Sequence, residues 1–304
     1  MERRDFMQKT LLAGASLMAA GISKANDPGT KNAEKPFNML YGTHDGMFRN
    51  NAGPDFIDQI KYAYDMGFRA IEDNGMTGRP ADQQQKIGDT LAKLGMTMGV
   101  FVLNKGGNGE NTLTANKPEY VEIFLKGCRQ AVEVSKRVNA KWVTVVPGDF
   151  DRHLSMGMQT TNVIEALRKG AEILEPHGII MVLEPLSDTP DLFLRYSDQT
   201  YEICKAVKSP SCKILFDMYH MQRNEGNMIN NMDAAWDEIA YFQIGDNPGR
   251  NEPTTGEVNY KNIFKHIYKK GYKGVLGMEH GNSVKGKEGE AVLIKAYRES
   301  DSFL

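Results

Sequence analysis

The sequence of 304 residues has the composition of a folded protein, because 40% of its residues are hydrophobic and 25% are charged. A disordered or collagen-like chain is therefore excluded. Its formal net charge of −2 provides no overall positive field that would attract nucleic acid or an anionic membrane surface. We expect no nucleic-acid partner, and the length suffices for one large domain with its own core.

The first 25 residues have the features of an export signal. Arg3 and Arg4 precede an uncharged run at residues 10–22 that is rich in Leu, Ala, Gly and Met, and small residues follow at its end. The run is too short to span a bilayer comfortably, and the segment Arg-Arg-Asp-Phe-Met-Gln-Lys resembles a twin-arginine signal. We expect cleavage near Ala25 or Ala20, a periplasmic product without stable membrane association, and a polar linker at residues 26–36. A frayed amphipathic terminus is the alternative.

From residue 37 onward, short runs rich in Val, Ile and Phe alternate with longer segments of helical periodicity. Eight strands are predicted, at residues 37–42, 69–73, 97–102, 142–147, 179–184, 213–217, 240–245 and 274–279. The clearest helices are predicted at 54–66, 81–94, 118–138, 159–176 and 260–270. Gly67, Gly95, Gly178 and Gly271 each end a helix, where glycine adopts the left-handed conformation at little cost. Residues 37–304 therefore predict a single-domain (β/α)8 TIM barrel, with a doubly wound sheet as the alternative.

Three cysteines lie in or beside these predicted elements and lack the CxxC spacing of a redox or zinc motif. They are Cys128, Cys204 and Cys212. Their odd number and their positions favour buried free thiols. A bridge between Cys204 and Cys212 stays open as the alternative.

Four side chains with oxygen donors stand at the C-terminal ends of four consecutive predicted strands. They are Glu184, Asp217, Gln243 and Glu279. The strand ends of a TIM barrel converge on the face that carries its active site, where three carboxylates would repel one another unless they shared a cation. Each residue alone is more simply a helix cap or an ion-pair partner, but four in succession favour a metal site. An all-oxygen set favours Mn²⁺ or Mg²⁺ over Zn²⁺.

Two segments near these residues carry a family resemblance. Phe-Asp-Met-Tyr-His-Met-Gln-Arg-Asn-Glu-Gly stands at 216–226, and Gln-Ile-Gly-Asp-Asn-Pro-Gly-Arg-Asn-Glu-Pro-Thr-Thr-Gly-Glu-Val-Asn-Tyr stands at 243–260. Both resemble the hydroxypyruvate isomerase family of xylose isomerase-like TIM barrels. The resemblance implies a metal-dependent isomerase that interconverts a small hydroxyaldehyde and a ketone. It implies that Glu184 and Glu279 bind the metal and exchange the substrate proton, and that Asp217 and Gln243 complete the metal site. By the same resemblance His220 and Arg250 hold substrate oxygens.

Proton transfer between neighbouring carbons gives these roles a physical reason. A base and an acid must flank the substrate, and carboxylates from the fifth and eighth strands can do so, with a cis-enediol(ate) as intermediate. His220 and Arg250 could instead be an ordinary loop histidine and a solvated loop arginine. By strand-end position alone, Glu72 is also expected to contact substrate. Five further positions are weaker candidates or helix-capping alternatives: His44, Asn104, Asp149, Glu252 and Glu257.

The residues after Glu184 and Glu279 depart from the family pattern. Leu-Ser-Asp-Thr occupies 186–189 and His-Gly-Asn-Ser occupies 280–283. The expected substrate is therefore a small sugar or hydroxy-keto acid rather than one defined compound. A ketose or sugar epimerase with the same metal site and a non-catalytic sugar-binding barrel are the alternatives. Related barrels with endonuclease activity use several zinc ions and many histidines, whereas this chain has six scattered histidines. Such barrels tend to form dimers or tetramers, which leaves a homo-oligomer open.

Overall fold

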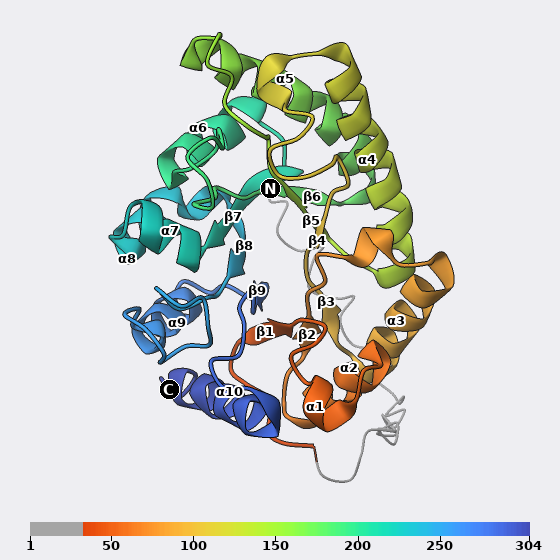
Figure 1. Cartoon of the computed structure of the whole chain (residues 1–304), viewed down its shortest axis with the longest axis vertical. Helices are drawn as coiled ribbons and strands as arrows, with labels where there is room; N and C mark the ends of the chain where they lie inside the picture. Colours follow the sequence, from red (N-terminus) through yellow and green to blue (C-terminus); the bar gives the residue numbers. More distant parts are fainter. Residues whose placement is uncertain (1–32) are drawn as a thin grey trace, which may run out of the picture. The chain divides into compact units, whose positions relative to one another are not determined.

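A computed structural model describes residues 33–304 (Figure 1). The predicted export signal and most of the predicted linker lie outside this range. Within it, none of the helices is both long and apolar enough to cross a membrane.

Nine short strands form one parallel sheet in the order β3-β2-β1-β9-β8-β7-β6-β5-β4. They are β1 (Leu40–Thr43), β2 (Ala70–Ile71), β3 (Thr97–Met98), β4 (Phe101–Val102), β5 (Trp142–Val145), β6 (Ile180–Leu183), β7 (Cys212–Asp217), β8 (Ile239–Gln243) and β9 (Val275–Gly277). The two ends of this order, β3 and β4, are two parts of the single strand predicted at 97–102. The sheet therefore closes on itself as an eight-position barrel, and the predicted TIM barrel is confirmed.

The interruption between β3 and β4 is caused by a side chain from the opposite wall. The Val100 N–H donates to the hydroxyl of Tyr241 on β8 at 3.2 Å, and a Cβ atom at Gly99 would lie 2.2 Å from that oxygen. The segment still joins both neighbours, because the Val100 carbonyl accepts from Asp73 N–H at 3.2 Å and Leu103 N–H donates to Thr144 at 3.0 Å. The Tyr241 hydroxyl thus replaces one backbone acceptor in the sheet, and the barrel remains closed.

Helices surround the strands on the outside of the barrel (Figure 1). They are α1 (Arg49–Ala52), α2 (Phe56–Asp65), α3 (Ala81–Leu94), α4 (Pro118–Val138), α5 (Met156–Leu174), α6 (Ser197–Val207), α7 (Met218–Asn224), α8 (Met228–Ala235), α9 (Tyr260–Lys269) and α10 (Gly286–Ser300), with short 3₁₀ turns at Met76–Gly78, Leu113–Ala115, Glu175–His177 and Trp236–Glu238. The main apolar core lies between these helices and the strands. A smaller cluster fills the barrel interior, with Val100, Val182, Leu215, Tyr241 and Val275 among its members.

Local sequence signals explain where several elements begin and end. The Asp55 side chain accepts from Ile57 N–H at 2.8 Å and so caps the start of α2. Gly67, Gly95, Gly178 and Gly271 all have left-handed φ angles, between +64° and +96°, as predicted. The three cysteines are buried and free. The prediction of free thiols is therefore confirmed.

We expect Gly88→Ala to destabilise the protein by about 1–3 kcal/mol, because overpacking a tight helix contact costs this much. A Cβ atom at Gly88 in α3 would lie 2.0 Å from the Arg137 carbonyl oxygen of α4. Urea denaturation would measure the free energy of unfolding. Gly157→Ala in α5 is the matched control, since a Cβ atom there meets no atom of residues 33–304 within 4 Å. That change should be neutral or stabilise by at most about 1 kcal/mol. Equal effects of both variants would contradict the packing argument.

Candidate active site

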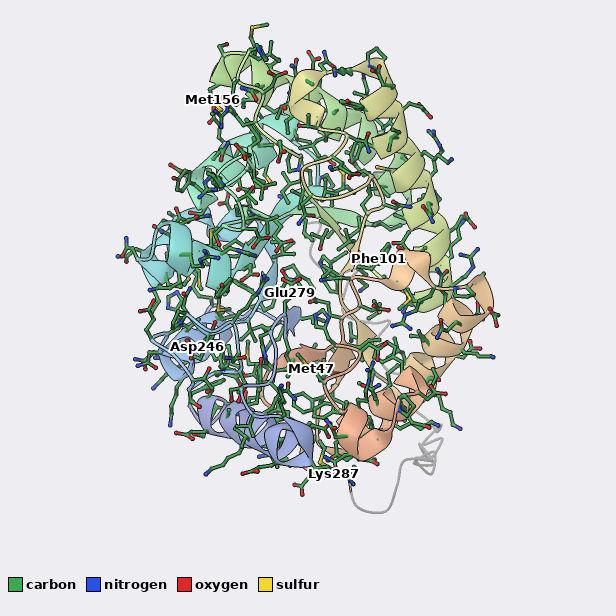
Figure 2. All side chains as sticks on the ribbon, viewed as in Figure 1. Met47, Phe101, Met156, Asp246, Glu279 and Lys287 are labelled. Carbon is green, nitrogen blue, oxygen red and sulfur yellow. The ribbon has the colours of Figure 1, made fainter. Side chains whose placement is uncertain are left out.

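The ends of strands β6 to β9 bring the four predicted ligand residues to the same end of the barrel. Glu184 follows β6 directly, Asp217 ends β7, Gln243 ends β8, and Glu279 stands two residues after β9. In Figure 2, Glu279 lies near the centre of the molecule, inside the ring of helices. One ligand atom from each of Glu184, Asp217, His220 and Glu279 lies within 4.8 Å of the others, which makes this a possible metal-binding group.

Burial and mutual repulsion raise the pKa values of two of these carboxyl groups. Burial raises the pKa of Glu184 well above its ordinary value, and the nearby charges of Glu279 and Asp217 raise it further. Burial and then Asp217 raise the pKa of Glu279 to about 8. The cluster therefore retains protons near neutral pH. A divalent cation would offset this repulsion and favour the ionised carboxylates.

Gln243 lies beside Asp217 in the sheet, because these two residues are paired in register at the ends of β7 and β8. Its Nε2 donates to Glu72 Oε1 at 2.5 Å, whereas its buried Oε1 has no hydrogen-bond partner in residues 33–304. A buried acceptor without a partner costs free energy that a cation can recover. Three clustered carboxylates and this free amide oxygen fit a hard divalent cation such as Mn²⁺ or Mg²⁺.

His220 contributes a hydrogen-bond donor to the same site. Asp217 caps the start of α7 by accepting from Tyr219 N–H at 2.7 Å, which places His220 fully buried on the first turn. The ring Nδ1 accepts from Ser187 N–H at 3.1 Å, and the Ser187 hydroxyl lies 2.8 Å from it. Because burial lowers the pKa of His220, the ring is neutral and its proton must be on Nε2.

The Nε2 atom of His220 has no hydrogen-bond partner among the described residues. It lies 3.6 Å from Asp217 Oδ2 and 3.8 Å from Glu184 Oε1. A protonated Nε2 donates to an oxygen and does not coordinate a cation, since a ligating imidazole carries its proton on the other nitrogen. The Nε2–H of His220 is therefore available as a hydrogen-bond donor beside the two carboxylates.

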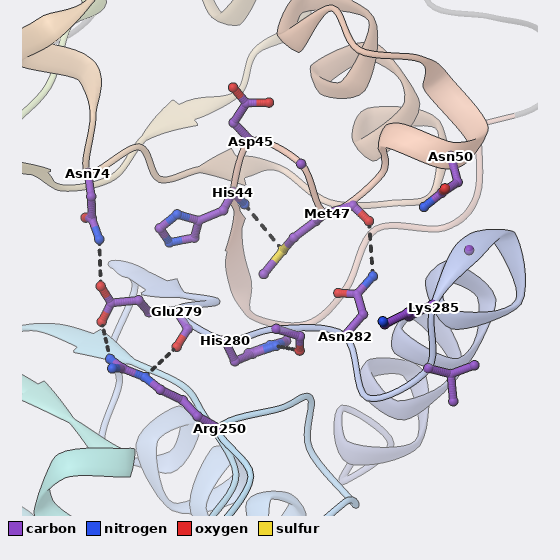
Figure 3. Close-up of a pocket in the computed structure, with 14 residues that line it drawn as sticks. His44, Asp45, Met47, Asn50, Asn74, Arg250, Glu279, His280, Asn282 and Lys285 are labelled. Atoms are coloured by element: carbon purple, nitrogen blue, oxygen red, sulfur yellow. Dashed lines mark hydrogen bonds and ion pairs between the residues drawn. The ribbon is translucent and has the colours of Figure 1, made fainter. Parts of the chain in front are cut away.

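Arg250 lies against two of the predicted ligands. Its Nη2 donates to Glu279 Oε2 at 2.7 Å (Figure 3) and to Asp217 Oδ2 at 3.2 Å. Its guanidinium lies over the Tyr219 ring at 4.8 Å. Burial lowers the pKa of Arg250, but the charges of Asp217 and Glu279 outweigh this and raise it. Arg250 is therefore a permanent positive charge at the edge of the carboxylate cluster.

The structure places Glu72 beneath the site rather than on its wall. Glu72 is fully buried, and its carboxylate contacts His44 Nε2 at 3.0 Å, Gln243 Nε2 at 2.5 Å and the Tyr241 hydroxyl at 2.9 Å. Burial lowers the pKa of His44, but the Glu72 charge outweighs this and raises it. Both carboxylate oxygens of Glu72 are engaged by the protein itself.

The weaker candidates differ in their exposure and in their hydrogen-bond partners. Asn104 is exposed, and the Asp149 carbonyl accepts hydrogen bonds from Thr112 and Thr114. Glu252 is buried and accepts from the N–H of Ser283 at 2.9 Å and from its hydroxyl, which joins the loops after β8 and β9. Glu257 is exposed and accepts from Gln222 Nε2 at 3.2 Å.

Two functional contacts were not predicted from sequence. Ser187 orients His220, and Asn74 Nδ2 donates to Glu279 Oε1 at 2.6 Å (Figure 3). Asn74 stands in the turn that follows β2, where strand periodicity gives no signal. Ser187 stands in a loop and likewise has no such signal.

A cavity of about 750 Å³ opens beside Glu279 and Arg250 (Figure 3). Its outer wall is formed by the loops after β1 and β9, and its polar lining includes His44, Asn74, Asn282 and Lys285. The volume falls in the range of about 300–1,000 Å³ that is usual for small-molecule sites. Amide and charged side chains suit a hydroxylated ligand.

Comparison with known proteins gives consistent results. Residues 60–299 match a family described as xylose isomerase-like TIM barrel. Hydroxypyruvate isomerase from Escherichia coli (strain K12) is 31% identical over 231 residues, covering 74% of this chain and 88% of that protein. The 2-oxo-tetronate isomerase of Pectobacterium atrosepticum is 27% identical over 238 residues, covering 77% and 89% of the two chains.

Among solved structures, a protein described as AP endonuclease, family 2, from Brucella melitensis has a similar fold. Its TM-score is 0.73 at 23% identity, and the match covers 84% of this chain and 98% of that one. At this identity the likeness concerns the fold alone.

Proposed function

Because the chain belongs to the xylose isomerase-like TIM barrel family, we propose that it is a divalent-metal-dependent isomerase of a small hydroxy-carbonyl compound. The observation that carries the proposal is the cluster of Glu184, Asp217 and Glu279 with the free amide oxygen of Gln243. These four residues would hold Mn²⁺ or Mg²⁺. When bound, the cation would stabilise the negative charge that develops on the substrate oxygens during proton transfer.

The side chains of the protein would carry the proton itself. Glu184 and Glu279 come from the ends of β6 and β9 and would act on the substrate carbon as base and acid through a cis-enediol(ate). In the metal-free protein burial raises the pKa of both carboxyl groups, that of Glu279 to about 8, so each accepts a proton more readily than an exposed carboxylate would.

The remaining polar groups would hold the substrate in place. The Nε2–H of His220 would donate to a substrate oxygen beside the cluster, and the Arg250 guanidinium would bind a carboxylate or a pair of neighbouring oxygens. The names of the relatives point to short hydroxy-keto acids as the substrate class. The polar cavity beside Glu279 gives room for such a molecule.

A ketose or sugar epimerase is the second candidate. It is favoured by the cavity volume of about 750 Å³, which is more than a three-carbon substrate requires. The same two glutamates and the same cation would serve an epimerase, since inversion of a centre next to a carbonyl also begins with removal of a proton.

Product analysis in D₂O separates the two reactions. The Mn²⁺-loaded protein would be incubated with three- to six-carbon hydroxyaldehydes, ketoses and hydroxy-keto acids, and the products followed by proton NMR. An isomerase moves the carbonyl to the neighbouring carbon, whereas an epimerase inverts one centre and leaves the carbonyl in place. EDTA-treated protein is the control. Metal-loaded protein that produces neither turnover nor deuterium exchange would contradict both candidates.

The predicted signal at residues 1–25 leads us to propose in addition that the mature enzyme acts in the periplasm. Fractionation of cells that express the full chain tests this, and recovery of only uncleaved protein in the cytoplasmic fraction would refute it.

A further inference from the structure

The carboxylate of Glu72 occupies a space in the barrel interior that Gly277 on β9 leaves open. A Cβ atom at Gly277 on β9 would lie 1.5 Å from Glu72 Oε2, so any larger residue there would displace the carboxylate. The φ angle of Gly277 is not in the left-handed region, and glycine is therefore needed for space rather than for backbone conformation. Two hydrogen bonds fix Tyr241, which donates to Glu72 Oε2 and accepts from Val100 N–H.

A fixed carboxylate at this position determines the orientation of the Gln243 amide. Glu72 Oε1 accepts a hydrogen bond from Gln243 Nε2 at 2.5 Å, so the NH₂ end of the amide faces Glu72. The amide oxygen then faces the opposite way, where residues 33–304 give it no hydrogen-bond partner. An amide turned the other way would present N–H donors to the cation and could not bind it.

We propose that Glu72 is a positioning residue that holds the Gln243 amide with its oxygen toward the cation, and this rests on the metal-dependent function proposed above. Both oxygens of Glu72 already accept hydrogen bonds, and among the four proposed metal ligands only Gln243 donates to it. Its contact with His44 Nε2 at 3.0 Å extends the same network to the wall of the cavity.

Titration of the metal-free full chain with Mn²⁺ tests the proposal without relying on turnover. Glu72→Gln keeps the shape of the side chain but offers a donor as well as an acceptor, so Gln243 is no longer restricted to one orientation. We expect the Kd for Mn²⁺ to rise about 10–100-fold, as is usual when a residue that orients a metal ligand is changed. Gly277→Ala, which displaces the Glu72 carboxylate without altering Gln243, should raise the Kd similarly. Circular dichroism and thermal unfolding without metal would verify that each variant is folded.

Tyr241→Phe is the matched control. It removes the buried hydrogen bond to Oε2 and leaves the contact between Oε1 and Gln243, so the Kd should stay within about threefold of wild type even where stability falls. Glu72→Gln should also have almost no further effect in a Gln243→Ala background, because the two residues act in series.

Each outcome has a distinct meaning. A Kd for Glu72→Gln within twofold of wild type, or additive effects of the Glu72 and Gln243 changes, would overturn the positioning role and leave the proposed function standing. Mn²⁺ binding without turnover on any substrate would overturn the proposed reaction but not the positioning role. Wild-type protein that does not bind Mn²⁺ would overturn both.

Discussion

Glu184→Gln and Glu279→Gln are each expected to lower kcat/KM by at least about 10³-fold. General acid–base groups contribute about 10²–10⁴-fold to a rate, and each residue would also be lost as a charged ligand. Initial rates at saturating Mn²⁺ would measure the effect. Both substitutions should leave the metal-free protein as stable as wild type or more stable near pH 8, because each removes a carboxylate from a repelling, buried cluster.

Glu257→Gln is the control for these two variants. Glu257 is exposed in the loop between β8 and α9, and its side chain accepts a hydrogen bond from Gln222. Its activity should remain within about twofold of wild type, as is usual for a surface substitution. Retention of more than about a tenth of wild-type activity by either Glu184→Gln or Glu279→Gln would contradict the assigned roles.

Removal of the divalent cation is expected to abolish turnover, and added Mn²⁺ should restore it. Without the cation, three clustered carboxylates repel one another, and the negative charge that develops on the substrate oxygens is not stabilised. Activity would be measured after EDTA treatment and dialysis, and again after addition of Mn²⁺ or Mg²⁺. Full activity in the chelated protein would exclude the metal-dependent mechanism.

The pH dependence of the metal-free protein follows from the same cluster. The pKa of Glu279 rises from an ordinary value of 4.5 to about 8 on folding, so the folded state binds the proton more tightly than the unfolded state. The stability that this proton contributes is fully present below about pH 4.5 and is lost as the pH rises through about 8. The Tm of the metal-free protein should therefore fall as the pH rises from 5 to 8.5.

Binding of Mn²⁺ should reverse that trend. The cation binds the ionised carboxylates and displaces the proton, so release of one proton should lower the Kd about tenfold for each unit that the pH rises, up to about pH 8. The increase in Tm on adding Mn²⁺ should accordingly be greater at pH 8 than at pH 6. An equal increase at both values would mean that no carboxyl proton is displaced. Glu279→Gln tests the assignment, because it should flatten the Tm profile of the metal-free protein.

The order of elements was predictable because it depends on patterns within short segments. Helix α3 begins and ends at the predicted residues 81 and 94, and four glycines mark the helix ends as expected. The convergence of Glu184, Asp217 and Glu279 followed from the barrel alone, since equivalent strand ends meet on one face. The split of the third strand could not be predicted, because it depends on Tyr241, which is more than a hundred residues away in sequence.

The depth of Glu72 was unpredictable for a similar reason. Its position at a strand end indicates the mouth of the barrel, and a side chain at the mouth would contact substrate. Its carboxylate turns inward only because Gly277 leaves space on a strand far along the chain. The tautomer of His220 likewise depends on the backbone N–H of Ser187, and no pattern in the sequence connects these two residues.

The proposed metal ligands and most of the cavity wall come from different segments of the barrel. The ligands stand at the ends of β6, β7, β8 and β9, whereas much of the wall comes from the loops around His44–Asn50 and Gly281–Gly286. Exchange of either loop would change which molecules enter without altering the carboxylates. Enzymes of this architecture can therefore acquire new substrates by loop replacement while keeping one chemistry, and these two loops are the first segments to recombine in directed evolution of this protein.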